Sequence, residues 1–322
     1  MRLHGQGAIL MGVYRPDPAL LERQIISIAG QSVWDWTCTI AVDDTLPESV
    51  ALVEQFVAGD ARFVIVKREE NLGAYLNYEH LIGGVDKEQT WVAIADQDDY
   101  WYPNKLETLL RSLENTGAPA IVGRAMVKDS YGRVYGVTRR RPGDLISLLL
   151  LNQVSGGLMI MRGEVARTAV PFPPEIPRAL PDHWLAVWAS TWGHINFSDE
   201  VIQDYLQHPG NLVGEASLPP LIGTTRKAVR DSSIVRSLVV DTWRWRVAMA
   251  ATLLDRVPDA HSSADLLSIG HGGLSLPLLR TVTARLVRRD TPIRVAAALL
   301  LGAAADRWRP ICAWVTRVFP FR

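Results

Sequence analysis

The chain has 322 residues, of which 48% are hydrophobic and 21% are charged, and its formal net charge is zero. This composition indicates a globular protein with a sizeable core, and the neutral balance gives no reason to expect nucleic acid as a partner. Charge is nevertheless unevenly placed, since residues 277–322 hold nine arginines against two aspartates, a local net charge of +7. Cys38 and Cys312 are too few for a disulfide framework, which favours a reducing cytosol.

The two ends of the chain bear on its location. The opening MRLHGQGAILMGVY has no long apolar core after its basic start, so we expect no signal peptide. The longest apolar window near the other end, residues 295–305, is about half the length of a membrane span. We therefore expect a cytoplasmic protein that does not cross a bilayer but is able to lie peripherally on the inner face of the cell membrane.

Short apolar runs alternate with segments of helical periodicity through the first 130 residues. The runs are near-continuous, as in strands buried on both faces of a sheet, so the pattern predicts an α/β fold with a mostly parallel sheet between helices. The predicted strands are residues 8–13, 38–42, 62–66, 91–95 and 120–127, and the predicted helices are residues 20–29, 49–58, 74–82 and 105–115.

The later part of the chain is less regular. We predict a helix over residues 144–152, a strand over residues 158–161, a helix after Asp182 and a strand over residues 201–205. From about residue 223 onward the pattern is helical. The expected organisation is a sheet-containing domain over residues 1–222, followed by a helical, basic region over residues 223–322.

Polar side chains stand directly after several of the predicted strands. In a parallel sheet the carboxyl ends of the strands share one edge, and ligands gather there. We therefore expect a binding site at this edge. The residues that mark it are Tyr14, Asp43, Asp44, Arg68, Asp96, Gln97 and Asp98.

The segment WVAIADQDDYWYP ends a buried strand with Asp96, Asp98 and Asp99 crowded together. These like charges repel one another unless something positive lies among them. Mg²⁺ or Mn²⁺ bridging a diphosphate is the cation we expect, because both suit one or two carboxylates plus substrate phosphates. The alternative is an ordinary acidic surface turn.

The neighbouring strand ends suggest contacts for the rest of a nucleotide. A carboxylate at Asp43 or Asp44 can accept the imide N–H of uracil or thymine, with Tyr14 against the base, although a plain strand-ending turn would look the same. Past the third strand, Arg68 can reach a phosphate. Asn71, Leu72 and Gly73 follow, and Gly73 permits close backbone approach, although a turn that opens a helix would also use these residues.

Two residues further along are candidates for chemistry. Asp182 follows a proline-rich passage and precedes a tryptophan-rich helical stripe, where a carboxylate can act as a general base for an acceptor hydroxyl. A helix N-cap is the alternative role for such an aspartate. His208, in the turn QHPGN, is either a metal or phosphate ligand or a solvated histidine.

Seven segments in register give the chain a resemblance to the family 2 glycosyltransferases of the GT-A fold, and within them to bacterial rhamnosyltransferase-type enzymes. The matching segments span roughly residues 8–214. They are YRPDPALLERQIISIAGQSVWDW, VDDT, ENLGAYLN, ADQDDYWYPNKL, NQVSGG, PDHWLAVWAS and QHPGNLVGE.

The resemblance implies an inverting transfer of a sugar from a nucleotide diphosphate donor to a glycan or lipid-linked acceptor of the cell surface. It places Asp44 and Tyr14 on the base, with Asp43 assisting, and Asp96 on the ribose or near the metal. It places the divalent cation on Asp98, a further metal or diphosphate contact at His208, and the catalytic base at Asp182.

Two departures from the family pattern bear on donor recognition. Thr45, Leu46 and Pro47 follow the paired aspartates where the family usually shows glycine and serine, and Leu206 stands where relatives often carry an arginine. The donor therefore remains open between dTDP-rhamnose and a UDP-hexose or UDP-N-acetylhexosamine. A protein that binds a nucleotide sugar without turning it over is a third reading.

The basic C-terminal region lies outside the resemblance. Residues 277–322 mix apolar and basic residues with tryptophans near the end, as do helices that lie in a membrane interface. Packing on the core or on a second subunit, which would make a homo-oligomer, is the alternative.

Overall fold

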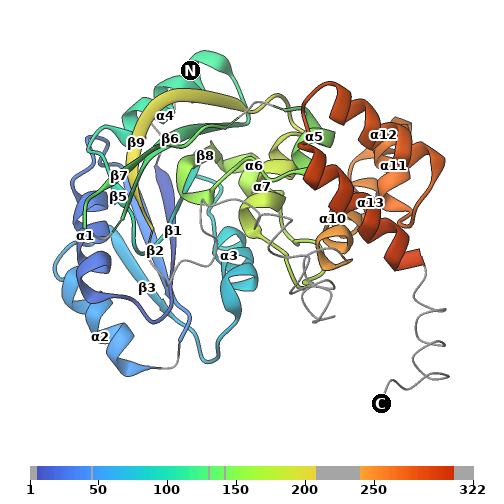
Figure 1. Ribbon diagram of the computed structural model, residues 1–322. Helices are drawn as coiled ribbons and strands as arrows, with labels where there is room; N and C mark the ends of the chain where they lie inside the picture. Colours follow the sequence, from blue (N-terminus) through green and yellow to red (C-terminus); the bar gives the residue numbers. More distant parts are fainter. Residues whose placement is uncertain (1–5, 45, 130, 141–142, 208–239, 308–322) are drawn as a thin grey trace. The chain divides into compact units, whose positions relative to one another are not determined.

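The computed structural model describes residues 6–44, 46–129, 131–140, 143–207 and 240–307 (Figure 1). The chain divides into two compact units. The first unit consists of Met1–Pro142, Gln153–Phe172 and Leu180–Glu215, and the second consists of Gly143–Asn152, Pro173–Ala179 and Ala216–Arg322. The domain boundary expected after residue 222 lies outside the described residues and stays a prediction.

A nine-stranded sheet forms the centre of the first unit. Its strands follow the order β3-β2-β1-β4-β8-β6-β9-β5, and β7 pairs with β6. The first four in this order are parallel neighbours, which confirms the predicted α/β class and places their carboxyl ends at one edge. The strands are β1 (Gly7–Val13), β2 (Trp36–Val42), β3 (Phe63–Lys67), β4 (Trp91–Ala95), β5 (Tyr100–Trp101), β6 (Ala120–Asp129), β7 (Val134–Val137), β8 (Met159–Arg162) and β9 (Asn196–Gln207).

Helices cover both faces of this sheet (Figure 1). One face carries α1, α2 and α4, and the other carries α3, α6 and α7. Burial on both sides explains why β1 and β4 read as near-continuous apolar runs. The helices are α1 (Pro18–Ala29), α2 (Pro47–Phe56), α3 (Gly73–Gly83), α4 (Lys105–Thr116), α6 (Gly163–Arg167) and α7 (Pro181–Ala189), with a 3-10 turn, η1 (Gly156–Leu158), before β8.

Strand register and a helix cap position the site edge. Met11 of β1 pairs with Ala95 of β4, and Val13 pairs with Val42 of β2, so the segments that follow these strands emerge together. The turn after β1 ends at Asp17, whose Oδ1 accepts hydrogen bonds from the backbone N–H groups of residues 19 and 20 at 3.0 and 3.1 Å. This N-cap, with proline at the first helical position, starts α1 at Pro18, two residues before the predicted start.

The structure departs from the predicted elements in the second half of the sheet. Strand β8 is antiparallel to both of its neighbours, β4 and β6. Strand β5 has two residues, too few for a period-2 pattern to be recognised. Strand β9 begins before the predicted residues 201–205 and ends after them. Its first residues, NFSDE, are mostly polar and partly or fully exposed, so they carry no buried-strand pattern in the sequence.

The second unit is helical in its described part. It contains α5 (Leu145–Leu150), α10 (Thr242–Arg256), η3 (Pro258–Ser262), α11 (Ala264–Gly270), α12 (Leu276–Val287) and α13 (Ile293–Arg307). The buried guanidinium of Arg285 ties these helices together, since it bonds Asp144 at the start of α5 and lies 3.7 Å from Asp265 and 3.8 Å from Asp290. Among the described helices, none has the length and apolar character needed to span a bilayer.

Candidate active site

The carboxyl edge of the parallel strands holds the predicted site residues, and hydrogen bonds join the segments that leave it. After β4, the Gln97 side chain bonds the backbone of Tyr14 after β1, accepting from its N–H at 2.9 Å and donating to its carbonyl at 3.1 Å. The backbone N–H of Arg15 donates to Asp44 after β2 at 2.9 Å. Arg15 adopts a positive φ of 43°, unusual for a side chain other than glycine. The Tyr14 ring, 43% exposed, is left at the surface of this edge.

Asp44 is buried, and both of its carboxylate oxygens accept hydrogen bonds within the protein. Its carboxylate accepts hydrogen bonds from the Ser49 hydroxyl at 2.6 Å and from the backbone N–H of Leu46 at 2.9 Å, in addition to that of Arg15. Burial raises the pKa of Asp44, but these donors outweigh burial and hold the pKa below its ordinary value. Asp44 therefore stays ionised and fixes the loop after β2.

Asp43 links β2 to the start of α3. Its Oδ1 accepts the backbone N–H of Leu72 at 2.8 Å, and Asn71 Oδ1 accepts that of Gly73 at 2.8 Å. Burial raises the pKa of Asp43, opposed by the backbone donors of residues 72 and 73 and by the charge of Arg68. Gly73 has a φ of +73°, which favours glycine.

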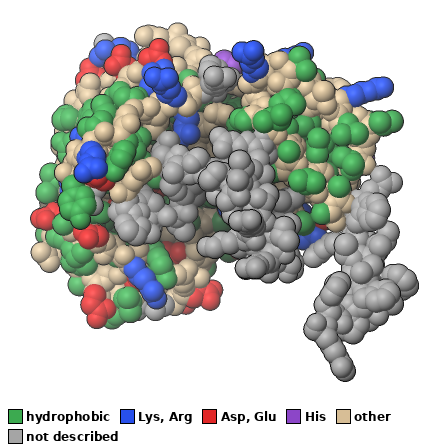
Figure 2. Space-filling view, viewed as in Figure 1, with side chains coloured by type: hydrophobic (Ala, Val, Ile, Leu, Met, Phe, Trp, Pro, Cys, Tyr) green, Lys and Arg blue, Asp and Glu red, His purple; other side chains and the backbone are tan. Residues whose placement is uncertain are grey.

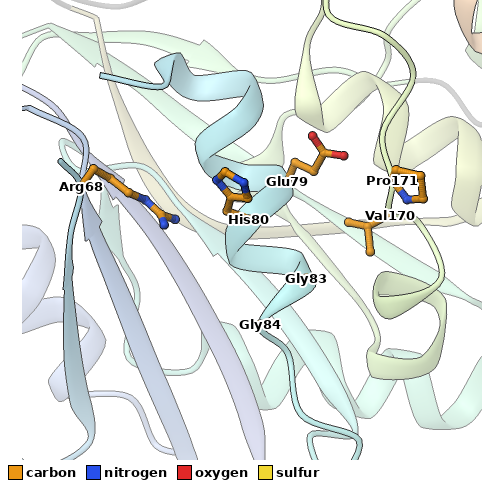
Figure 3. Close-up of a pocket in the computed structure, with 7 residues that line it drawn as sticks. All are labelled: Arg68, Glu79, His80, Gly83, Gly84, Val170 and Pro171. Atoms are coloured by element: carbon orange, nitrogen blue, oxygen red, sulfur yellow. The ribbon is translucent and has the colours of Figure 1, made fainter. Parts of the chain in front are cut away.

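Arg68 follows β3 and donates through Nε to Asn77 of α3 at 3.0 Å. It also lines a pocket of about 760 Å³ with Glu79 and His80 of the same helix (Figure 3). Figure 3 shows the Arg68 side chain extending from the strand end toward α3. The other lining residues are Gly83, Gly84, Val170 and Pro171.

The acidic segment after β4 brings its carboxylates close to Asp182. Burial is the largest cause that raises the pKa of Asp96, and the negative charges of Asp98 and Asp182 raise it further, to about 7. Lys105 opposes this rise. Three carboxylates from two distant parts of the sequence thus interact at the strand edge, as the sequence predicted for Asp96 and Asp98.

A buried polar network lies behind these carboxylates. Lys105 is fully buried, and its Nζ donates at 2.5 Å to the Gly157 carbonyl and at 2.5 Å to Gln203 Oε1. Gln203 in turn donates through Nε2 to Asp99 Oδ2 at 2.5 Å. Burial raises the pKa of Asp99 and lowers the pKa of Lys105, and in each case the charge of the other opposes the effect.

Other contacts hold the acidic segment rigid. Arg23 of α1 donates to the carbonyls of Asp98 and Asp99 at 3.0 and 3.3 Å. Lys105 Nζ lies 3.5 Å from the centroid of the Trp101 ring, a cation–π contact. The Tyr78 hydroxyl donates to the Ala95 carbonyl at 2.9 Å and so fixes the last residue of β4.

Two glycines of the segment NQVSGG allow the site to close. A Cβ added to Gly157 would lie 2.9 Å from Asp96 Oδ2 and 3.2 Å from Asp99 Oδ2, so a side chain there would displace a carboxylate. A Cβ added to Gly156 would lie 3.5 Å from the Cβ of Asp182. This turn therefore packs directly between the acidic segment and α7.

Asp182 is in the first turn of α7. The N-cap of this helix is Leu180, so Asp182 does not hold the N-cap position that was its alternative reading. Asp182 Oδ1 accepts the backbone N–H of His183 at 2.7 Å, which orients the carboxylate. His208 lies outside the described residues, and its predicted role stays a prediction.

The donor set suits a hard divalent cation. Carboxylate oxygens are the ligands that Mg²⁺ and Mn²⁺ prefer, and Asp99 Oδ1 is buried without a hydrogen-bond partner in the described structure, so one carboxylate oxygen of the acidic segment has no donor of its own. No group of three or more histidine, cysteine, aspartate or glutamate ligands forms a closed metal site among the described residues. A cation held here would therefore take part of its coordination from substrate oxygens, as Mg²⁺ commonly does.

Sequence reasoning missed several residues of this site. Lys105 stands inside the quoted segment ADQDDYWYPNKL but was assigned no role, and Gln203 and Arg23 gave no signal beyond ordinary strand and helix positions. The paired glycines of NQVSGG were a visible signal, because two adjacent glycines before a strand indicate close approach of other atoms.

Comparison with known proteins shows which proteins the chain resembles. Residues 9–165 match the family described as Glycosyl transferase family 2. A Sinorhizobium fredii protein, y4gI, whose function is uncharacterized, is 29% identical over 108 residues, which make up 33% of this chain and 12% of that protein.

Solved structures show the same fold. TarS from S. aureus, residues 1–349 in complex with UDP-GlcNAc, superposes with a TM-score of 0.59 at 14% identity, covering 97% of this chain and 87% of that one. The same protein in complex with UDP gives a TM-score of 0.55, covering 81% and 69%. At this identity the similarity establishes the fold, which is the GT-A glycosyltransferase fold.

Proposed function

We propose that this chain is an inverting, metal-dependent glycosyltransferase that moves a sugar from a nucleotide diphosphate donor to a hydroxyl group of a glycan or lipid-linked acceptor. The observation that carries the proposal is the approach of Asp182 to Asp96 and Asp98, in a chain whose residues 9–165 match glycosyl transferase family 2. A carboxylate that can act as a general base, beside a carboxylate pair that can hold a cation on a diphosphate, suits an inverting glycosyl transfer.

The donor is proposed to lie along the carboxyl edge of the sheet. The exposed Tyr14 ring supports the nucleotide base, and Asp44 and Asp43, already fixed by backbone donors, shape the wall of its pocket. Arg68 is placed to contact a phosphate. Asp96 and Asp98 would hold Mg²⁺ or Mn²⁺, which neutralises charge on the diphosphate when bound.

The proposed transfer is a single displacement at the anomeric carbon of the donor sugar. The acceptor hydroxyl loses its proton to the Asp182 carboxylate, and its oxygen forms a bond to the anomeric carbon of the donor sugar. The bond from that carbon to the phosphate oxygen breaks, and its electron pair leaves with the nucleotide diphosphate. Attack from the opposite side inverts the anomeric centre. The His183 N–H, which binds Asp182 Oδ1, keeps the base oriented during this step.

For the sugar, L-rhamnose from dTDP-rhamnose is the first candidate on the resemblance of segments such as ADQDDYWYPNKL. A UDP-hexose or UDP-N-acetylhexosamine is the second, and the TarS complex, which contains UDP-GlcNAc, makes that nucleotide sugar a necessary member of any donor panel.

A donor panel tests the proposal. Purified protein with Mn²⁺ is incubated with dTDP-, UDP- and GDP-sugars, and donor hydrolysis and transfer to acceptors are followed. We expect turnover of one donor, lost in Asp182→Asn while donor binding persists. Asp199→Asn, an exposed aspartate of β9, is the matched control and should keep full activity. Turnover that survives in Asp182→Asn would refute the assigned base.

A further inference from the structure

The last two described helices, α12 and α13, expose faces of unusual composition. On α12, Leu276, Arg280 and Val287 are exposed at spacings that place them on one face of the helix, and the exposed Arg288 follows directly as its C-cap. On α13, Ile293 and Leu301 are exposed on a common face. The remaining exposed residues of the two helices whose side chains are described are proline, threonine or alanine, so none of them is acidic.

The aliphatic side chains on these faces are largely open to solvent. Leu276 is 71% exposed, Val287 77%, Ile293 72% and Leu301 61%. Single exposed aliphatic residues are normal on a protein surface. Here four of them are exposed on two helices that contact each other, and we call these four side chains and the arginines beside them the patch. Exposed apolar patches mark interaction sites. Figure 2 shows hydrophobic side chains gathered over the part of the second unit where these helices lie.

Helix α13 is apolar on its inner side as well. Val295, Ala296 and Leu299 are buried against the rest of the second unit, so packing within the unit already uses that side. The outer residues Ile293 and Leu301 therefore do not contribute to the core of the second unit. A surface helix normally carries polar residues on this side, and their replacement by aliphatic residues requires another explanation.

Arginines accompany the patch without acidic partners. Val287 ends α12, the exposed Arg288 and Arg289 follow it, and the exposed Ile293 begins α13, so aliphatic and basic side chains stand near one another along this connection. Asp290 also lies in the connection, but its carboxylate is 3.8 Å from the buried Arg285. Within the described part of the chain, Arg280, Arg288 and Arg289 form no ion pair. Arg285, on the inner side of the same helix, is by contrast surrounded by three aspartates.

We propose that the exposed faces of α12 and α13 dock on the surface of a membrane that contains anionic lipids. Aliphatic side chains that enter the headgroup region, with arginines beside them to meet lipid phosphates, are the features of an interfacial helix. None of the described helices spans a bilayer, so the contact lies along the surface. The inference goes beyond transfer activity and does not depend on it, because binding to a vesicle requires no turnover.

The positive charge of the patch disfavours two other occupants, a second copy of the chain and the chain's own residues 308–322. A second copy docked on the same patch would bring its Arg280 and Arg288 toward those of the first copy, and like charges oppose such a dimer. The chain that follows, residues 308–322, contains three arginines and no acidic residue, so its charge does not complement the patch either. An anionic lipid surface satisfies both the aliphatic and the basic side chains.

Flotation of the full chain with phosphatidylcholine vesicles, with and without phosphatidylglycerol, tests the proposal. Two variants alter the patch separately, Val287→Ser/Ile293→Ser/Leu301→Ser and Arg280→Gln/Arg288→Gln. We expect the wild type to bind only the anionic vesicles. Removing the two arginines should weaken binding by about 25-fold, about fivefold for each. The aliphatic variant should lose binding at least as strongly, because insertion of apolar surface supplies the rest of the affinity.

Control variants remove exposed cationic or apolar side chains from the first unit instead. Lys87→Gln/Arg111→Gln removes two exposed cations, and Val64→Ser/Tyr131→Ser removes two exposed apolar side chains. Both controls should bind like the wild type, and all variants should keep the wild-type circular dichroism, since every change is at an exposed position.

Several results would overturn the proposal. They are absence of wild-type binding to anionic vesicles, equal binding by the aliphatic variant, or equal binding to vesicles without phosphatidylglycerol. Loss of binding in the arginine variant alone would indicate a purely electrostatic contact with some polyanion. A wild-type dimer that becomes monomeric in the aliphatic variant, with vesicle binding unchanged, would assign the patch to a second copy.

Discussion

Replacing Lys105 by methionine should strongly destabilise the first unit. Lys105 is fully buried, its Nζ donates to Gly157 and Gln203 at 2.5 Å each, and it lies over the Trp101 ring. Methionine has a similar length but supplies no donor, so the buried acceptors and the Asp99 carboxylate lose their compensation. Removing one partner of a buried charged network costs about 3–5 kcal/mol.

Thermal unfolding followed by circular dichroism measures this effect. A loss of about 3–5 kcal/mol corresponds to a fall in midpoint of about 6–20 °C for a domain of this size. Lys87→Met, at an exposed lysine, is the control and should stay within about 0.5 kcal/mol of the wild type.

A double variant separates charge from packing. If Asp99 is the charge that Lys105 compensates, Lys105→Met/Asp99→Asn should be more stable than Lys105→Met alone, because the uncompensated carboxylate is gone. We expect a coupling free energy of about 1–3 kcal/mol between the two positions. A midpoint of Lys105→Met within about 2 °C of the wild type would refute the reasoning, since that shift corresponds to less than about 1 kcal/mol.

Three further outcomes are expected. Asp182→Asn should lower the turnover number at least about 100-fold with an unchanged donor dissociation constant, because a general base contributes about that much. A donor affinity that falls by the same factor as the turnover number would point to a role in donor binding instead. Gly157→Ala should weaken metal-dependent nucleotide binding measured by calorimetry, since its Cβ would lie 2.9 Å from Asp96 Oδ2. In the second unit, burial raises the pKa of Asp144 but its bonds to Arg285 hold it below the ordinary value, so the stability it contributes is present above about pH 4 and is lost as the pH falls through the folded pKa. Urea unfolding of the wild type and Asp144→Asn should therefore differ at pH 7, and the difference should begin to shrink at about pH 4 and vanish only below the folded pKa of Asp144, which lies lower.

The strands that are buried on both faces of the sheet can be recognised from the sequence. The strands β1 and β4 are apolar throughout because helices cover both faces, and this continuity identifies them without any knowledge of pairing. The antiparallel insertion of β8 is not readable, because the direction of a strand is set by the path of the chain through space. The two-residue β5 is too short to have a period.

The candidate site divides in a similar way. Asp96 and Asp98 are evident from the sequence because crowded carboxylates after a buried strand need an explanation. Lys105 is not evident from the sequence, because lysine is almost never fully buried and a lysine at the start of a helix is therefore expected to be exposed. The engagement of Asp44 by Ser49 is also invisible in sequence, since it depends on the turn of the chain between them.

Calorimetric titration of nucleotide diphosphates, with and without Mn²⁺, is the most direct test of the central claim that the carboxylates after β4 form a metal-dependent donor site. The wild type and Asp98→Ala would be titrated with UDP, dTDP and GDP, with Asp199→Asn as the control. We predict binding of one nucleotide that requires Mn²⁺ or Mg²⁺ in the wild type and in the control, and that is lost in Asp98→Ala. Equal affinity with and without the cation, or unchanged binding in Asp98→Ala, would contradict the claim.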